Sequence, residues 1–227
     1  MTTIDKTRPA NSPNNTWQGL LAPCLRGAVF VALVTGLAYP LATTALAKLL
    51  LPQQAGGSLI VQGQTVRGSS LIGQQFAGAY YFHPRPSATT GANPDGSGSS
   101  VSQPYNAGAS LGSNLGPTNA ALIAAVQERA QAYRQLNGLP PQAPVPVDAV
   151  TASASGLDPH ISVANAQWQI ARIAQTRQMP AAQLQGLVAQ HTEGRLFGLL
   201  GEPRVNVLML NLALDAAAQK VGESREQ

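Results

Sequence analysis

The feature that most constrains the fold is one uncharged, apolar run near the N-terminus. No side chain from Gly27 to Ala47 is charged, and the run reads GAVFVALVTGLAYPLATTALA. Extended to Leu51 as a helix, it would measure about 37 Å, because each residue adds about 1.5 Å. The hydrocarbon core of a bilayer is about 30 Å thick, so we expect residues 27–51 to form one tilted transmembrane helix.

The charges that flank this run predict which way it crosses the membrane. More basic residues precede it than follow it closely: Lys6, Arg8 and Arg26 against Lys48. Because basic residues favour the cytoplasmic side, we expect residues 1–26 in the cytoplasm and residues 52–227 outside it. An alternative stays open, because Ala45-Leu46-Ala47 resembles a signal-peptidase site that would release the domain, although signal sequences have shorter apolar regions.

Charge in the rest of the chain argues against a nucleic-acid-binding surface. From residue 49 onward, ten basic side chains face nine acidic ones, so the net charge of +4 arises mostly beside the apolar run. Nucleic-acid binding requires clustered basic residues, and we expect no nucleic acid as a partner. No lysine lies between Lys48 and Lys220, which excludes a Walker A phosphate loop and Schiff-base chemistry there.

Residues 52–227 mix short strands with helices and predict a single α+β domain, with α/β as the alternative. Short apolar pieces between glycines indicate strands within 58–72, and Val205–Leu210 is the strongest predicted strand. Helices are predicted from apolar spacing and capping residues: one over 118–136 capped by Thr118, one from Ser162 and one from Pro180.

Residues 84–117 differ from the rest of the domain in composition. They are dominated by Gly, Ser, Asn, Pro and Thr, and such a segment has too little apolar surface to order itself. Loops of this length are usually functional or disordered. We therefore expect a flexible polar loop and a candidate contact surface.

The densest polar block is Ser153–Ser162, which contains Ser155, Asp158 and His160. These three could form the triad of an anchored or secreted hydrolase, and that function is the alternative hypothesis. No Gly-x-Ser-x-Gly elbow is present, and triads join residues that are usually remote in sequence. We favour a turn at Asp158 with Ser162 as a helix cap, and assign no catalytic residue. A soluble-ligand-binding module is a third hypothesis.

A metal site is not expected from the sequence. Asp158 and His160 could supply two ligands, with His83, His191 and Glu193 as remote candidates. The single cysteine, Cys24, precedes the apolar run, and no His-x-x-x-His pair exists. Cysteine ligands and His-x-x-x-His pairs are both common in zinc sites. Residues 52–227 contain neither, which argues against a zinc site there.

Several sequence blocks occur together in order: Leu71–Phe76, Tyr81–Ala88, Gly112–Asn119, Ser153–Ser162 and Gly201–Leu208. With the single N-terminal span, these blocks resemble the KdpC family, the C subunit of the Kdp potassium-transporting ATPase, over nearly the whole chain. Two features depart from the family pattern. Leu111 stands where a glycine is usual, and the insert at 91–102 is long and rich in glycine and serine.

The resemblance implies an accessory, non-catalytic subunit of a high-affinity potassium uptake complex in the bacterial inner membrane. Its implied partners are a channel-like potassium-binding subunit and a P-type ATPase subunit that hydrolyses ATP. The resemblance also implies that the chain itself acts as a catalytic chaperone, which raises the ATP affinity of the pump subunit. The chain itself has no phosphate loop, so we expect no cofactor of its own, with ATP entering only through the partner.

We expect this subunit to act by contact, through seven polar side chains in the blocks named above. These candidate contact residues are Arg85, Asn114, Asp158, His160, Glu202, Arg204 and Asn206. Arg85 lies between two prolines that stiffen the chain, and a fixed guanidinium can bind a carboxylate with two hydrogen bonds. The sequence leaves open whether that carboxylate belongs to a partner or to the same domain.

Overall fold

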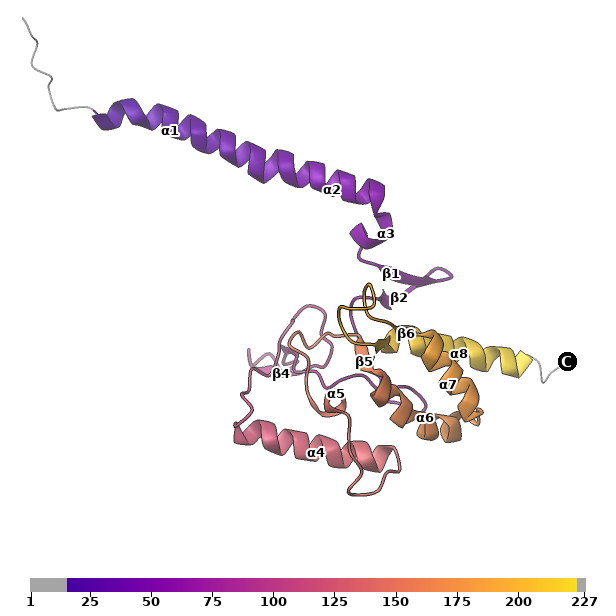
Figure 1. Ribbon diagram of the computed structural model, residues 1–227. Coiled ribbons are helices and arrows are strands. Elements are labelled where there is room, and N and C mark those ends of the chain that lie inside the picture. Colours follow the sequence, from indigo (N-terminus) through magenta and orange to yellow (C-terminus); the bar gives the residue numbers. More distant parts are fainter. Residues whose placement is uncertain (1–15, 224–227) are drawn as a thin grey trace, which may run out of the picture. The chain divides into compact units, whose positions relative to one another are not determined.

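The computed structural model describes residues 16–223 and the side chains of residues 19–218. Lys6 and Arg8, which contribute to the predicted orientation, lie outside the described residues. The chain divides into two compact units between Gly57 and Ser58, and each is considered by itself. Figure 1 traces a long helix in the first unit and a mixture of helices and short strands in the second (Figure 1).

A continuous helix makes up most of the first unit. Its parts are α1 (Thr16–Leu33), a π-helical turn (Val34–Ala38) and α2 (Tyr39–Leu50), followed by the short α3 (Pro52–Ala55). The stretch Gly19–Leu50 has a mean hydropathy of 1.9, and within residues 16–223 it alone is long and apolar enough to cross a membrane. The predicted apolar helix is therefore present, and within the described residues it already includes Thr16, upstream of Gly27.

The π-helical turn accommodates Pro40. In a regular α-helix, proline lacks the N–H that would donate, and its ring clashes with the carbonyl four residues earlier. Here the N–H of Tyr39 donates to the carbonyl oxygen of Val34, five residues earlier, so a widened turn lies directly before the proline. The helix consequently continues through Pro40 to Leu50.

Two hydroxyl groups of this helix bond to its own backbone. Thr35 Oγ1 donates to Val31 O at 2.7 Å, and Thr43 Oγ1 donates to Tyr39 O at 2.9 Å. Hydrocarbon offers no acceptor for a free hydroxyl, so these internal bonds suit a lipid environment.

The second unit combines helices with antiparallel strands, which confirms the α+β prediction. Its helices are α4 (Ala120–Leu136), α5 (Val147–Val150), α6 (Val163–Arg177), α7 (Ala181–Gln190) and α8 (Val207–Glu223). Two hairpins are formed by β1 (Leu59–Gln62) with β2 (Thr65–Ser69), and by β3 (Thr90–Ala92) with β4 (Ser100–Ser102). A third sheet has the spatial order β5 (His160–Ser162), β7 (Arg204–Asn206) and β6 (Thr192–Glu193).

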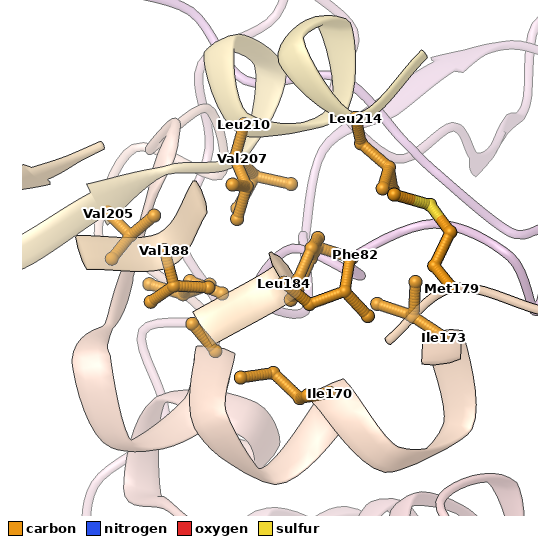
Figure 2. Packing of buried hydrophobic residues seen from close by; sticks show 12 residues of the cluster. Phe82, Ile170, Ile173, Met179, Leu184, Val188, Val205, Val207, Leu210 and Leu214 are labelled. Atoms are coloured by element: carbon orange, nitrogen blue, oxygen red, sulfur yellow. The ribbon is translucent and has the colours of Figure 1, made fainter. Parts of the chain in front are cut away.

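The hydrophobic core lies among α6, α7, α8 and the loop that carries Phe82. Phe82, Leu184, Leu210 and Leu214 are fully buried. Figure 2 shows Leu210 and Leu214 of α8 pointing toward the space around Phe82, Leu184 and Met179 (Figure 2). This core holds α8 against α7 and thereby fixes the end of β7, from which α8 starts.

Two buried polar side chains attach the Phe82 loop to the helices. Asn211 of α8 accepts a hydrogen bond from Phe82 N and donates to Phe82 O, both at 2.9 Å. Arg172 of α6 is 7% exposed, and burial lowers its pKa to about 10, so it stays charged at neutral pH. Its guanidinium donates to neutral oxygens: Ala79 O, Tyr81 O, Asn137 Oδ1 and Gln169 Oε1.

The strand predicted over Val205–Leu210 is wrong beyond Asn206, where α8 begins instead. Asn206 Oδ1 accepts a hydrogen bond from Met209 N at 3.1 Å, which satisfies a free donor in the first turn of the helix. Leu210 and Leu214 then bury one face of α8. A short run that is apolar except for Asn206 lacks the periodicity that separates a buried strand from a buried helix.

One of the two predicted helix caps is confirmed. Ser162 Oγ accepts from Asn165 N at 3.1 Å and caps α6 as predicted. Thr118 does not cap α4, because Asn119 Oδ1 accepts from Ala121 N at 2.9 Å. Asparagine is a stronger N-cap than threonine, so the neighbouring residue takes the position.

The segment 84–117 contains the β3–β4 hairpin and is organised around one buried threonine. Thr89 is fully buried, and its hydroxyl donates to Gln103 O at 2.6 Å and accepts from Asn106 N at 3.1 Å. The Thr89 hydroxyl, together with the backbone bond from Gln103 N to Thr89 O at 3.0 Å, thus connects both ends of the hairpin. The flexibility of this segment and its role as a contact surface stay predictions.

Candidate functional site

Residues 153–160, termed the loop hub, are where segments far apart in the sequence meet. Carbonyl oxygens of the hub accept hydrogen bonds from three other segments: Gly73 N to Leu157 O (2.8 Å), Ser87 Oγ to Gly156 O (2.7 Å) and Leu111 N to Ser155 O (3.0 Å). Each donor lies within or beside one of the blocks on which the family resemblance rests. These blocks therefore assemble around one loop.

Glycines allow the hub to approach its neighbours closely. Gly156 has a φ of 67°, and a Cβ at this position would lie 2.5 Å from Leu111 O and 2.6 Å from Thr89 Cγ2. A Cβ on Gly112 would lie 2.7 Å from Ala154 O. Positive φ and close backbone contact both favour glycine. The packing of these segments around the loop hub therefore depends on glycines, which carry no functional group.

Arg85 bonds within its own domain. Its Nη1 donates to Asp158 Oδ2 at 2.9 Å, and the two side chains are 24% and 28% exposed. The prolines on either side restrict the backbone and present the guanidinium to the hub. One carboxylate partner of Arg85 thus belongs to the same chain, and contact of Arg85 with a partner subunit stays a prediction.

Asp158 begins a chain of ionisable groups that crosses the β5-β7-β6 sheet. His160 Nδ1 lies 3.3 Å from Asp158 Oδ1, and His160 Nε2 lies 3.7 Å from Glu193 Oε2. The same Glu193 oxygen accepts from Arg204 Nε at 3.0 Å. We call the set Arg85, Asp158, His160, Glu193 and Arg204 the charge chain. Antiparallel pairing of β7 with both β5 and β6 brings together the last three members of the charge chain, His160, Glu193 and Arg204.

The neighbours of Asp158 in the charge chain lower its pKa. Burial by itself would raise the pKa, but hydrogen bonds from His160 and Arg85, with the positive charge of Arg85, outweigh it and lower the pKa to about 2. Asp158 is therefore ionised at neutral pH. Each oxygen of this carboxylate already accepts a bond inside the domain, from Arg85 Nη1 or from His160 N.

The remaining predicted contact residues are placed differently from one another. Glu202 binds Arg195 Nη2 at 2.8 Å, and its side chain is 79% exposed. Asn206 is 4% exposed, caps α8 and donates to Ser70 O at 2.8 Å. Asn114 is exposed in the loop before α4, with a φ of 53°. The structure thus brings four of the seven predicted residues into the charge chain and leaves these three outside it.

The hydrolase alternative receives no support from the positions of Ser155 and His160. A triad requires the histidine to bond the serine hydroxyl, but both ring nitrogens of His160 face carboxylates instead. Ser155 Oγ accepts from Leu157 N at 3.1 Å, and no bond to His160 is found between these two described side chains. Among the side chains of residues 19–218, no three His, Cys, Asp or Glu groups are arranged to hold a metal.

A feature that the sequence analysis missed is the exposed loop between β6 and β7, termed the apolar hairpin (residues 195–202). Leu196, Phe197, Leu199 and Leu200 are 60%, 86%, 81% and 62% exposed. Two backbone hydrogen bonds join Leu196 to Leu200, and Phe197 has a φ of 53° at the tip. The signal was the Leu-Phe-Gly-Leu-Leu run between Gly194 and Gly201, which equally fits a buried strand.

Ion pairs clamp the base of the apolar hairpin. Arg195 bonds Glu202 at 2.8 Å across the loop, and Arg204 bonds Glu193 at 3.0 Å one step further along the strands. The charges therefore cancel in pairs beside the apolar tip. Contiguous exposed apolar surface rimmed by polar residues marks interaction sites in soluble domains.

A family model and the most similar relatives described here all indicate the same protein family. The family model for the K+-transporting ATPase c chain, KdpC, matches residues 21–216. The potassium-transporting ATPase KdpC subunit of Rhodopseudomonas palustris (strain BisB18) is 57% identical over 187 residues, which are 82% of this chain and 92% of that protein. The KdpC subunit of Variovorax paradoxus (strain S110) is 55% identical over 199 residues, which are 88% of this chain and 97% of that protein. The chain therefore belongs to the KdpC family, the c chain of the K+-transporting ATPase.

Proposed function

We propose that this chain is a non-catalytic accessory subunit of an ATP-driven, high-affinity potassium uptake complex, and that it acts by stabilising the assembly. The observation that carries the proposal is the apolar hairpin, whose four large side chains are 60–86% exposed. Its partner would be the channel-like potassium-binding subunit. The P-type ATPase subunit of the same complex would hydrolyse ATP.

Energetics favour the apolar hairpin over the charge chain as the contact. Burying a leucine or phenylalanine side chain yields about 1.5–3 kcal/mol, and no ion pair has to be broken to bury Phe197. Most members of the charge chain already bond one another, so a partner would have to replace existing hydrogen bonds. Of the predicted contact residues, exposed Glu202 and Arg204 at the hairpin base are best placed to touch a partner.

The proposed location is the bacterial inner membrane, with the N-terminus in the cytoplasm and the second unit outside. The apolar helix Gly19–Leu50 supports the anchoring, and the basic residues before it support the orientation. A fusion of alkaline phosphatase to the C-terminus should be active, because that enzyme matures only outside the cytoplasm. An inactive phosphatase, paired with an active cytoplasmic reporter at the same position, would reverse the orientation.

ATP enters the proposal only through the pump subunit. A subunit that favours one conformational state of a complex changes ligand affinity at a distant site without touching the ligand. We therefore propose that the chain raises the ATP affinity of the pump subunit indirectly. The ATP KM of the complex should rise when this chain is removed, while the purified full chain alone should show no saturable ATP binding.

The direct test of the accessory role is co-purification. The full chain, tagged at its C-terminus, is expressed in potassium-starved cells, extracted in mild detergent and purified. Near-equal amounts of the potassium-binding and P-type ATPase subunits should accompany it. Recovery of the chain alone, stable and still associated with membranes, would contradict the proposal.

A further inference from the structure

A cavity of about 370 Å³ lies beside α4 in the second unit and has no role in the function proposed above. One wall is formed by α4, including Arg129 and Tyr133, and another by residues 83–87. Apolar parts of the lining come from Phe76 and Leu136, together with prolines. Its volume falls in the range of small-molecule sites, about 300–1,000 Å³.

The charged residues that line this cavity are both arginines. Arg85 and Arg129 line it, whereas no aspartate or glutamate belongs to the lining. Burial lowers the pKa of His83, another lining residue, and raises the pKa of Tyr133, so both rings are neutral at pH 7. The lining therefore contains two guanidinium groups and no carboxylate, although Arg85 is paired with Asp158 outside the lining.

Both guanidinium groups retain unused donors. Arg129 Nη1 donates to Val150 O at 3.0 Å, and within the described part of the chain Arg129 has no carboxylate oxygen within ion-pair distance. Arg85 Nε is buried and has no hydrogen-bond partner among the described residues. A buried donor without an acceptor is costly, about 1–3 kcal/mol, and an arriving oxyanion would remove that cost.

The acids near the cavity are engaged elsewhere. Asp158 accepts from Arg85 Nη1, which leaves Arg85 Nε free for another acceptor. Asp148 accepts from Ser162 N and Oγ and from Asn165 Nδ2. Neither carboxylate bonds Arg129.

We propose that this cavity binds a carboxylate, held by the Arg129 guanidinium and Arg85 Nε, with its organic remainder against Phe76 and Leu136. The volume exceeds that of a carboxylate group alone, so the ligand carries further carbon atoms. The carboxylate comes either from a free small acid or from an acidic side chain of a partner subunit. Both sources require the same two arginines, and the inference does not depend on the apolar hairpin being the assembly contact.

The first experiment is calorimetric titration of the purified full chain in detergent with disodium succinate at constant ionic strength. Succinate should bind saturably, and succinamide, its neutral analogue, should not. Arg129→Gln should weaken succinate binding at least about tenfold, because one charge-assisted hydrogen-bonding group is lost.

The matched control is Arg134→Gln. Arg134 also lies on α4, and its Nε donates to a backbone carbonyl, Ala143 O, at 2.9 Å, but it does not line the cavity. Succinate affinity should be unchanged in this variant. Absence of saturable binding to the parent chain, or equal weakening in both variants, would overturn the proposal.

A labelling experiment tests the same claim without a substitution, in case Arg129→Gln impairs folding. Phenylglyoxal modifies arginine side chains, and the extent at each arginine can be read by peptide mass spectrometry. Succinate should protect Arg129 and leave Arg134 unaffected, and succinamide should protect neither. Equal protection of both arginines, or none at Arg129, would contradict a site in this cavity.

The source of the carboxylate is decided in the purified complex. Undiminished succinate binding, with Arg129 protected only when succinate is added, would support a free small acid. Protection of Arg129 before any succinate is added, with reduced partner recovery in Arg129→Gln but not in Arg134→Gln, would support a partner's acidic side chain. If succinate fails to protect Arg129 both in the isolated chain and in the complex, neither source of the carboxylate is supported and the proposal is overturned.

Discussion

The loop hub and the apolar hairpin lie in the same unit and use their residues in opposite ways. In the hub, charged and polar groups bond within the chain itself, as the Asp158 carboxylate does with Arg85 Nη1 at 2.9 Å. In the hairpin, Phe197 is 86% exposed and its apolar neighbours are 60–81% exposed. We therefore interpret the hub as a loop that stabilises the domain. We interpret the hairpin as an interaction surface that a partner would bury.

This difference shows that functional-looking polar motifs can be structural. Serine, aspartate and histidine in the block 153–162 suggest chemistry, yet Ser162 caps α6 and Asp158 joins Arg85 to His160. The short apolar run of the hairpin suggests a core strand, yet it lies outside the core. Substitutions in the two regions should therefore separate stability from assembly.

The largest expected effect is a loss of stability on Gly156→Ala. A Cβ would meet Leu111 O at 2.5 Å, and alanine is strained at a φ of 67°. Strain and overpacking together should lower the free energy of unfolding by about 3 kcal/mol. Urea unfolding of the purified full chain, followed by circular dichroism, measures the change.

The control for that substitution is Gly194→Ala, at the entrance to the apolar hairpin. A Cβ there would have no neighbour within 4 Å, so the free energy of unfolding should change by less than about 0.5 kcal/mol. Similar effects of the two substitutions would remove the structural distinction between hub and hairpin.

The next effect should be a loss of assembly, without a loss of stability, on Phe197→Asp. Aspartate tolerates the positive φ of this position, so the chain should unfold as before. Loss of one buried aromatic contact should weaken association by about 2 kcal/mol, roughly thirtyfold. Partner recovery in quantitative co-purification measures it, and Ile123→Asp on α4, where Ile123 is 47% exposed, is the control.

Asp158→Asn should lower stability by about 1–2 kcal/mol at neutral pH and leave assembly largely intact. The folded-state pKa of about 2 lies below the ordinary value of 3.8, so the ionised carboxylate stabilises the folded state. That contribution is complete above about pH 4 and is lost as pH falls toward 2. The difference in unfolding free energy between parent and variant should therefore shrink over this interval, and a constant difference would contradict the assigned ionisation.

The smallest effect should come from Arg204→Ala. The Arg204–Glu193 pair is 55% and 49% exposed, and solvent-exposed pairs contribute about 0.5 kcal/mol because water screens them. Unfolding free energy should change by no more than that, and partner recovery should fall less than with Phe197→Asp. A larger assembly defect than that of Phe197→Asp would move the contact from the apolar tip to the charged base.

Local rules predicted much of the fold from the sequence. The apolar helix followed from one uncharged run, and α6 followed from Ser162 and its apolar spacing. The α8 boundary could not be predicted, because Val205–Leu210 is apolar except for Asn206, whose side chain accepts from Met209 N where the helix begins. Propensity and periodicity give no answer in such a run.

The candidate site was predicted in part. The sequence singled out Arg85, Asp158, His160 and Arg204, but their junction through Glu193 depends on β7 pairing with both β5 and β6. Such pairing is a long-range feature that motif spacing does not encode. Exposure of Phe197 likewise follows from the tight Leu196–Leu200 turn, not from the residue types.

The most direct test of the assembly surface is photo-cross-linking from Phe197 in the assembled complex. A benzoylphenylalanine replaces Phe197 in the full chain, and a second variant carries it at Ile123 as the exposed control. We expect an efficient cross-link from position 197 to the potassium-binding subunit and little from position 123. No cross-link from position 197 in a complex that purifies intact, or equal cross-linking from both positions, would contradict the claim that the apolar hairpin is the contact.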